Sequence, residues 1–384
     1  MTGKERVQAA LAHKKTDRLP LAYEATTEVT EALAKYFDLD VIEENPGVSA
    51  FHAPSVGNKG VGLNQEIALQ KLLGVDLVKI ACPINSQKTI GNWFGMPLLS
   101  QAGSVITGAW GITFREYEYP YGTYVEILDS PLKNEENMDV IMNYPSPDLD
   151  LFDYDVLRKI MPKFDGFYRL LNMNGCFDFA RFMRGPEQFF VDMALNPEIA
   201  EILMDKVNDF AIAYLDRCME TAGEFFDGVY CGDDFGTQRG LSMSPAMWRD
   251  MIKPRYKKLV DKVHSYGLTY CHHSCGGVRP IIPDMIEIGF DILNPIQPLA
   301  LGMEPAELSK EYADQLVFYG AIDEQETLPH GSVDNVRAEV IERSKTLGRL
   351  GSYIVAPSHG FQPDTPIENI LAVYETVTNR KLAK

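Results

Sequence analysis

The segment richest in reactive side chains is Cys271-His272-His273-Ser274-Cys275-Gly276-Gly277. Side chains alternate between the two faces of a strand, so His273 and Cys275 point the same way and Cys271 can join them. His272 then points toward the covering helices. An imidazole and a thiolate two residues apart form a natural half-site for zinc, and the two glycines allow a sharp turn afterwards. By spacing alone, a buried cysteine beside a hydrogen-bonded histidine is the more common arrangement.

A further histidine strengthens the zinc interpretation. His359 lies in Ala356-Pro357-Ser358-His359-Gly360, at the end of the last apolar run of the chain, and can reach the same place. His273, Cys275 and His359 would then be three ligands with one position left open. That pattern is typical of catalytic rather than structural zinc. The alternative for His359 is a turn histidine held by local hydrogen bonds.

Carboxylate and amide side chains lie at the ends of other apolar runs. Asp233, Asp234 and Glu24 could each supply a fourth metal ligand or an acid–base group. Two aspartates that face each other cannot both ionise freely, although alternation along the chain can separate them. Asp234 could instead cap the next helix. We take Asp233, Glu24 and Asn172 as candidate catalytic residues.

Eight short apolar runs would carry these side chains. Runs of this length suit strands that are buried on both faces. They are residues 19–23, 76–82, 167–174, 227–233, 268–274, 291–297, 316–322 and 353–359. Helical patterns occupy residues 4–17, 192–222, 245–266, 278–288 and 334–349. This alternation predicts an α/β fold, a (β/α)8 TIM barrel, in which the carboxyl ends of all strands meet at one mouth.

Residues 83–150 interrupt the alternation. Residues 113–119 and 124–128 read as two strands joined at Tyr121-Gly122, which predicts a β-hairpin insertion after the second strand. Five aromatic side chains there could line a pocket or pack the hairpin, namely Trp110, Tyr117, Tyr119, Tyr121 and Tyr124. We therefore expect one TIM-barrel domain over residues 1–384, with an N-terminal helix within 1–18 and an insertion at about 83–150.

The charge balance excludes two classes of partner. The net charge is −18 and the pI is about 4.8, which opposes binding to nucleic acid and to anionic membranes. No apolar run approaches the ~20 residues of a membrane helix, and the first residues lack the apolar segment of a signal peptide. Six cysteines are few for 384 residues. We therefore expect a cytoplasmic protein with reduced thiols.

Taken together, several short motifs resemble the uroporphyrinogen decarboxylase superfamily over nearly the whole chain. They are Glu5-Arg6 with Asp17-Arg18-Leu19-Pro20, Trp110-Gly111-Ile112, Ser130-Pro131-Leu132, Gly232-Asp233-Asp234-Phe235-Gly236-Thr237-Gln238, Ser244-Pro245 with Ile252-Lys253-Pro254, His273-Ser274-Cys275-Gly276, Ile286-Glu287-Ile288-Gly289, Asn294-Pro295-Ile296-Gln297 and Asp364-Thr365-Pro366-Ile367-Glu368-Asn369.

Two branches of that superfamily differ in the residues after the first strand. True decarboxylases carry an Arg-Gln-Ala-Gly-Arg segment there for the carboxylates of the porphyrinogen, whereas this chain has Leu21-Ala22-Tyr23-Glu24-Ala25. The chain is more similar to the corrinoid-dependent (methylcobamide) methyltransferases. Those enzymes bind zinc through His-x-Cys and a later cysteine. His273 and Cys275 match the first two ligands, and His359 stands where the later cysteine is expected.

The resemblance implies a zinc-dependent methyltransferase. It would move a methyl group between a small methylated substrate and the cobalt of a corrinoid (cobalamin). We find no Asp-x-His-x-x-Gly motif, so a partner corrinoid-binding protein would carry the corrinoid. A methoxylated aromatic substrate, and thus O-demethylation, would suit zinc as a Lewis acid. The alternatives are a decarboxylase-type lyase, a methylcobamide:thiol methyltransferase and a non-catalytic metal- or corrinoid-binding protein.

Overall fold

Seven parallel strands form the central sheet of the computed structural model, which describes residues 1–39, 55–56, 61–93, 96–120 and 122–382. They lie side by side in the order β15, β14, β13, β12, β9, β8, β2. Their bounds are β2 Leu77–Ala81, β8 Tyr168–Asn174, β9 Gly228–Gly232, β12 Thr269–His273, β13 Ile292–Ile296, β14 Val317–Ile322 and β15 Tyr353–Pro357. These are seven of the eight predicted strands, each in its predicted place.

The eighth position of the barrel is a two-residue connection. Leu21 forms a parallel bridge with Val355 of β15, and Ala22 forms one with Leu77 of β2, so the two edges of the sheet are joined. Pro20 precedes them and has no N–H to donate, which limits how far this pairing extends. The predicted TIM barrel is thus confirmed, with the predicted strand 19–23 reduced to its central residues.

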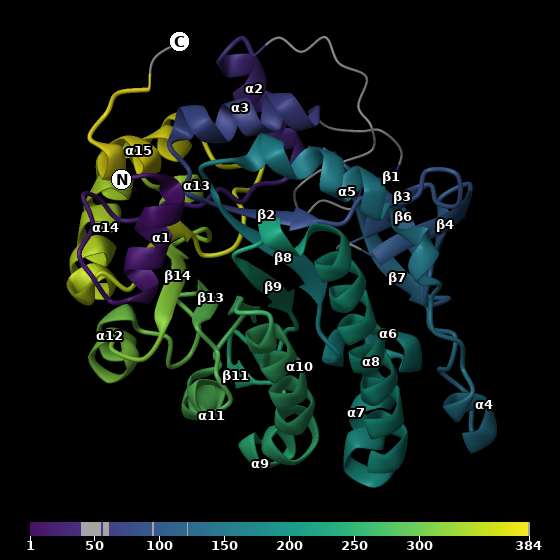
Figure 1. The fold of residues 1–384 in the computed structure, drawn as a ribbon. Helices are drawn as coiled ribbons and strands as arrows, with labels where there is room; N and C mark the ends of the chain where they lie inside the picture. Colours follow the sequence, from purple (N-terminus) through teal and green to yellow (C-terminus); the bar gives the residue numbers. More distant parts are fainter. Residues whose placement is uncertain (40–54, 57–60, 94–95, 121, 383–384) are drawn as a thin grey trace.

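Helices surround the curved sheet (Figure 1). The longer ones are α1 Gly3–Leu11, α2 Thr27–Tyr36, α3 Leu63–Leu73, α5 Tyr154–Ile160, α6 Phe177–Arg184, α7 Pro186–Leu195, α8 Pro197–Ala222, α10 Lys253–Ser265, α11 Ile282–Glu287, α12 Pro305–Tyr312, α14 Val333–Thr346 and α15 Ile367–Thr378. Ser244 caps the segment before α10 by accepting a hydrogen bond from the Met247 N–H, as its sequence position predicts. No helix in the described ranges is long and apolar enough to cross a membrane.

Helix α1 closes the amino-terminal end of the barrel. Val7 packs among the side chains that fill the barrel interior. The buried Arg6 guanidinium donates to Asp76 Oδ1 at 2.6 Å and Arg18 donates to Asp76 Oδ2 at 2.6 Å. The arginines of the Glu5-Arg6 and Asp17-Arg18 motifs therefore fasten this end of the barrel, far along the strands from the mouth.

The insertion contributes more strands than the predicted hairpin. Its five described strands join β1, which comes from before β2, in an antiparallel sheet of order β1-β3-β4-β5-β6-β7 to the right of the barrel in Figure 1. Their bounds are β1 Ser55–Val56, β3 Gly91–Trp93, β4 Met96–Ala102, β5 Val105–Gly108, β6 Thr113–Tyr119 and β7 Gly122–Asp129. The predicted hairpin is β6 and β7. The other strands were not predicted, because β1, β3 and β5 have four residues or fewer and the longer β4 is buried at one end and exposed at the other without alternating.

Candidate metal centre and active-site mouth

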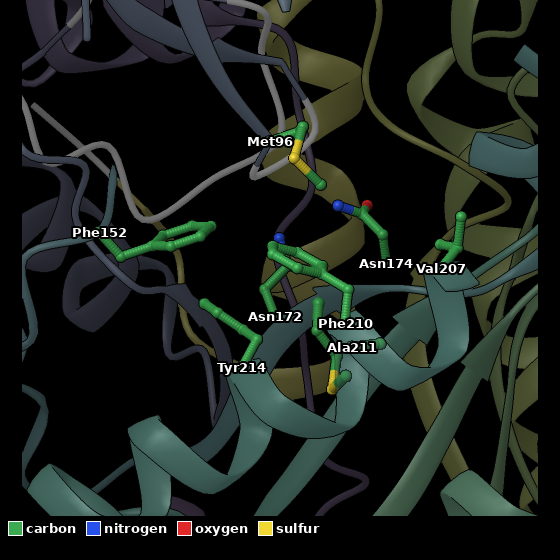
Figure 2. Close-up of a pocket in the computed structure, with 9 residues that line it drawn as sticks. Met96, Phe152, Asn172, Asn174, Val207, Phe210, Ala211 and Tyr214 are labelled. Atoms are coloured by element: carbon green, nitrogen blue, oxygen red, sulfur yellow. The ribbon is translucent and has the colours of Figure 1, made fainter. Parts of the chain in front are cut away.

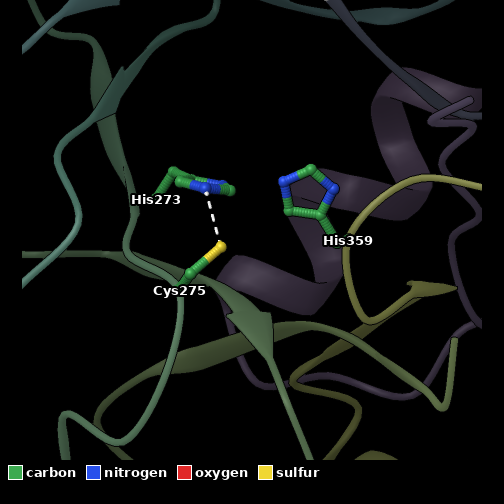
Figure 3. A group of neighbouring side chains, drawn as sticks. All are labelled: His273, Cys275 and His359. Atoms are coloured by element: carbon green, nitrogen blue, oxygen red, sulfur yellow. Dashed lines mark hydrogen bonds between the residues drawn. The ribbon is translucent and has the colours of Figure 1, made fainter. Parts of the chain in front are cut away.

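Three predicted metal ligands meet at the mouth of the barrel. Potential ligand atoms of His273, Cys275 and His359 all lie within 4.8 Å of one another (Figure 3). His273 ends β12, Cys275 follows it by two residues, and His359 comes from the loop after β15. The Nε2 atom of His273 is 3.4 Å from the Cys275 Sγ atom. The two rings lie 5.7 Å apart between centroids.

The donor set and its spacing suit zinc. Zinc bonds of about 2.0–2.3 Å in a tetrahedral site separate neighbouring ligand atoms by roughly 3.5 Å. The observed separations require only small side-chain movements to reach that geometry. Two imidazoles and a thiolate are borderline-soft ligands of the kind that zinc prefers. Gly276 has φ +81°, and a Cβ there would collide with the backbone of Thr237, so the turn after Cys275 requires glycine.

His273 is held from below by two buried side chains. Its Nδ1 atom lies 2.8 Å from Asn294 Oδ1 and 2.7 Å from Tyr230 Oη. The Tyr230 hydroxyl also donates to Asn294 Oδ1 at 2.9 Å. His273 thus has one nitrogen engaged with the barrel and the other directed toward Cys275.

Asp234 contacts both ligands of the His-x-Cys pair. Its Oδ1 atom accepts a hydrogen bond from the Cys275 backbone N–H at 2.8 Å and lies 3.6 Å from His273 Nε2. Burial raises the pKa of the Cys275 thiol well above its usual range, and the negative Asp234 adds to this shift. A bound divalent cation favours the thiolate and acts against that shift.

His359 faces the cavity with an exposed ring, while protein surrounds its other sides. That enclosure lowers the pKa of His359, and the neighbouring His273 ring lowers it further. The imidazole is therefore favoured in the neutral form that binds a metal.

The remaining residues of the Cys-His-His-Ser-Cys segment point away from this group. His272 is fully buried against the helices and stacks on Phe235 at 5.0 Å, as strand alternation predicts. Cys271 packs inside the barrel with Tyr230 and other interior residues, so it does not join the ligands. All six cysteines are free thiols.

Asp233 and Asp234 have different surroundings. Asp233 is 1% exposed, and its oxygens accept hydrogen bonds from the backbone N–H groups of Phe177 at 2.6 Å and Asp178 at 2.9 Å. Tyr256 donates to the same carboxylate. Asp233 therefore caps the amino terminus of α6 from below the mouth, whereas Asp234 reaches the cluster. The part of Asp233 in catalysis stays a prediction.

Glu24 forms a buried ion pair across the barrel interior. Its Oε2 atom lies 3.0 Å from the Lys79 Nζ atom, and Lys79 is 1% exposed. Burial opposes ionisation of Glu24, but the charge and hydrogen bond of Lys79 together with a hydrogen bond from Tyr319 outweigh it, so the pKa of Glu24 is lowered. Glu24 is therefore a carboxylate at neutral pH, and it lies beside the cluster.

A cavity of about 210 Å³ opens next to the three ligands. The predicted residues Glu24, Asn172, Asp233, His273 and His359 all line it, so the structure brings them together. Its outer wall comes from α6 through Asp178, Phe179, Arg181 and Phe182. A second, more apolar pocket of only about 20 Å³ shares Asn172, Met173 and Asn174 with it and is lined by Met96, Phe152 and Phe210 (Figure 2).

The aromatic side chains of the insertion pack within the insertion or against its neighbours. Tyr117 and Tyr124 stack with ring centroids 5.5 Å apart, and Trp110 contacts Phe210 of α8. This arrangement agrees with the hairpin-packing interpretation. Tyr121 lies outside the described residues. The aromatic walls of the larger cavity are instead Phe179, Phe182 and Tyr230.

Sequence reasoning missed several polar residues of the mouth. Burial beside Glu24 raises the pKa of Glu324 to about 8, and burial raises that of Asp178 to about 6. Arg181 pairs with Asp178 across one turn of α6. The helix start after β8 was detectable from the sequence, because Asn174-Gly175 marks the end of that strand. Glu324 directly follows Asp323, whose carboxylate instead accepts hydrogen bonds from three backbone N–H groups.

The family model for uroporphyrinogen decarboxylase (URO-D) matches residues 115–380. The chain belongs to the uroporphyrinogen decarboxylase family. This confirms the resemblance seen in the sequence. The matched range contains every strand of the barrel except β2, and it includes the His-x-Cys pair and His359.

Relatives within this family have different activities. The methylcobamide:CoM methyltransferase MtaA from Methanosarcina barkeri is 29% identical over 176 residues, which cover 46% of this chain and 48% of that protein. A uroporphyrinogen decarboxylase from Thermus thermophilus is 28% identical over 182 residues, with 46% and 47% covered. The chain thus spans about half the length of the curated relatives it matches. A methyltransferase from Methanosarcina mazei has the same fold, with a TM-score of 0.65, 19% identity and 99% of both chains covered.

Proposed function

We propose that this protein is a zinc-dependent methyltransferase. It moves a methyl group between a small methylated substrate and the cobalt of a corrinoid that a partner protein carries. The observation that carries the proposal is the convergence of His273, Cys275 and His359 beside a cavity at the barrel mouth. The likeness to a methylcobamide:CoM methyltransferase supports the same activity. The free cysteines fit the reducing conditions of a cytoplasmic protein.

The proposed chemistry follows from the properties of zinc. Zinc supplies a Lewis acid that polarises a substrate oxygen or stabilises a thiolate. His273, Cys275 and His359 would hold it, while Asp234 orients the His-x-Cys pair through the Cys275 backbone N–H. Glu24 keeps negative charge beside the site. Asn172, on the cavity wall, orients the substrate, and Asp233 fixes α6, which forms the outer wall.

A methoxylated aromatic is the substrate class that we favour. The larger cavity offers the rings of Phe179 and Phe182 to an aromatic body. O-demethylation would release a phenol oxygen, which zinc can polarise as a Lewis acid. A thiol acceptor is the second candidate, because the likeness to the CoM enzyme favours it.

Decarboxylation of a tetrapyrrole fits this cavity less well. Several substrate carboxylates require several cationic partners. Among the described lining residues, Arg181 is the one arginine, and Asp178 already neutralises it. Glu24 and Asp234 add negative charge at the same place.

A screen of methylated compounds against cob(I)alamin tests the proposal. We expect a methoxylated aromatic to yield the methylcob(III)alamin spectrum with zinc-loaded protein. His273→Ala and Cys275→Ala should each abolish that signal. The proposal fails if no compound yields the spectrum, or if both variants retain wild-type transfer.

A further inference from the structure

Two fully enclosed polar side chains lie directly beneath His273. Asn294, on β13, is 1% exposed and Tyr230, on β9, is 2% exposed. Both strands neighbour β12, and the ladder pairs Asn294 with His273. The Tyr230 ring forms part of the cavity wall, whereas Asn294 does not line the cavity. The polar atoms of both residues contact Nδ1 of His273, so they are placed to orient that ring.

The hydrogen bonds determine which nitrogen of His273 carries the proton. Tyr230 donates to Asn294 Oδ1, an atom that can only accept, and His273 Nδ1 lies 2.8 Å from the same oxygen. With the Asn294 amide in this orientation, Nδ1 is the donor in that contact. The proton then resides on Nδ1, and Nε2 presents its lone pair toward the Cys275 Sγ atom. That is the tautomer a metal ligand needs.

The tyrosine is itself fixed by charge. The Lys79 Nζ atom lies 4.2 Å from the centroid of the Tyr230 ring, over its face, and Glu24 pairs with that ammonium at 3.0 Å. A buried cation above an aromatic ring attracts it and restrains its tilt. A chain of contacts thus runs from the Glu24–Lys79 pair through Tyr230 to His273.

We propose that Tyr230 and Asn294 are positioning residues that hold His273 in its Nδ1–H tautomer, so that Nε2 is ready to bind zinc. This inference rests on the proposed zinc site and adds the two residues that hold one of its ligands in place. Outer partners of metal-bound histidines commonly contribute ten- to hundredfold to metal affinity. We expect Asn294→Ala to weaken zinc binding by about that factor and Tyr230→Phe by about tenfold.

Competition against a chromophoric zinc chelator measures these affinities without any methyl transfer. Asn294→Asp is the conservative variant, since it offers acceptors only and should keep the affinity within about threefold of wild type. Tyr168→Phe is the matched control. Tyr168 is another tyrosine of the barrel interior whose hydroxyl hydrogen-bonds to Asp227 and Thr269, at the far end of the strands. It should leave zinc affinity unchanged.

Nitrogen-15 NMR of the histidine rings supplies a second readout. The metal-free wild type should show His273 with a protonated Nδ1, and Asn294→Ala should raise the population with a protonated Nε2. The inference is overturned if wild type shows the Nε2–H form, or if Asn294→Ala and Tyr230→Phe bind zinc as wild type does. Absence of zinc binding in wild type would instead overturn the proposed function itself.

Discussion

The two faces of the end of β12 place adjacent histidines in opposite environments. His272 points to the helices, where it is fully buried and contacts the rings of Phe235, Tyr256 and Phe290. His273 points to the mouth, where one nitrogen is hydrogen-bonded and the other faces Cys275. Strand alternation alone separates a histidine that contributes to packing from one that can bind a metal.

The largest expected effect comes from removing a ligand on the mouth face. Cys275→Ala removes one of three protein ligands, so zinc affinity and methyl transfer should each fall by about a hundredfold or more. The free energy of unfolding of the metal-free protein should change little, because the Cys275 side chain is only partly buried. Chelator competition and the methylcob(III)alamin assay measure the two losses. Wild-type zinc affinity in this variant would place the metal elsewhere.

A substitution on the opposite face of β12 should lower the stability of the protein and leave its zinc affinity nearly unchanged. His272→Ala leaves a cavity among three aromatic rings and should lower the free energy of unfolding by about 3 kcal/mol. Zinc affinity of the folded variant should stay within about threefold of wild type. Urea denaturation and chelator competition test the two statements. A variant that keeps full stability but loses zinc would reverse the assignment of the two histidines.

Asp233 and Asp234, which follow β9, show the same contrast between a buried side chain and one that faces the proposed zinc ligands. Asp233→Asn replaces an acceptor oxygen that faces only donors, so it should cost about 2 kcal/mol of unfolding free energy. Asp234→Asn should cost little stability but weaken zinc binding by about tenfold, since Asp234 orients the His-x-Cys pair. Denaturation and zinc competition on both variants measure the contrast. Equal effects of the two substitutions on zinc affinity would contradict it.

The smallest effect is a pH dependence at Glu324. Its pKa is raised from an ordinary 4.5 to about 8 by burial, so ionisation opposes folding as pH rises through this range. Because solvent reaches part of this side chain and screens its charge, Glu324→Gln should recover only about 1–2 kcal/mol of the full shift at pH 9, with no gain below pH 4.5. Urea denaturation at several pH values measures the difference. A stability change that is independent of pH would show that Glu324 is not protonated in the folded protein.

Strand alternation and strand ends allowed much of the barrel and site to be predicted. The eight apolar runs located all seven strands and the closing residues Leu21 and Ala22, because buried parallel strands are apolar on both faces. The alternation of side chains along a strand placed His273 and Cys275 on one face and His272 on the other. His359 followed from the rule that strand ends share one mouth.

Long-range partners were beyond the reach of sequence reasoning. The pairing of Lys79 with Glu24, and of Tyr230 and Asn294 with His273, depends on which strands are neighbours and on their register. The separation of Asp233 from Asp234 depends on α6, whose start contributes the N–H groups that Asp233 binds. The strands β1, β3, β4 and β5 beside the predicted hairpin were not predicted from the sequence.

X-ray absorption at the zinc edge tests the central claim most directly. Zinc-loaded wild-type protein should show one sulfur neighbour at about 2.3 Å and two imidazole nitrogens at about 2.0 Å. Cys275→Ala should lose the sulfur contribution. A zinc ion surrounded only by oxygen and nitrogen in wild type, or a sulfur signal that persists in Cys275→Ala, would contradict the assignment of His273, Cys275 and His359 as the ligands.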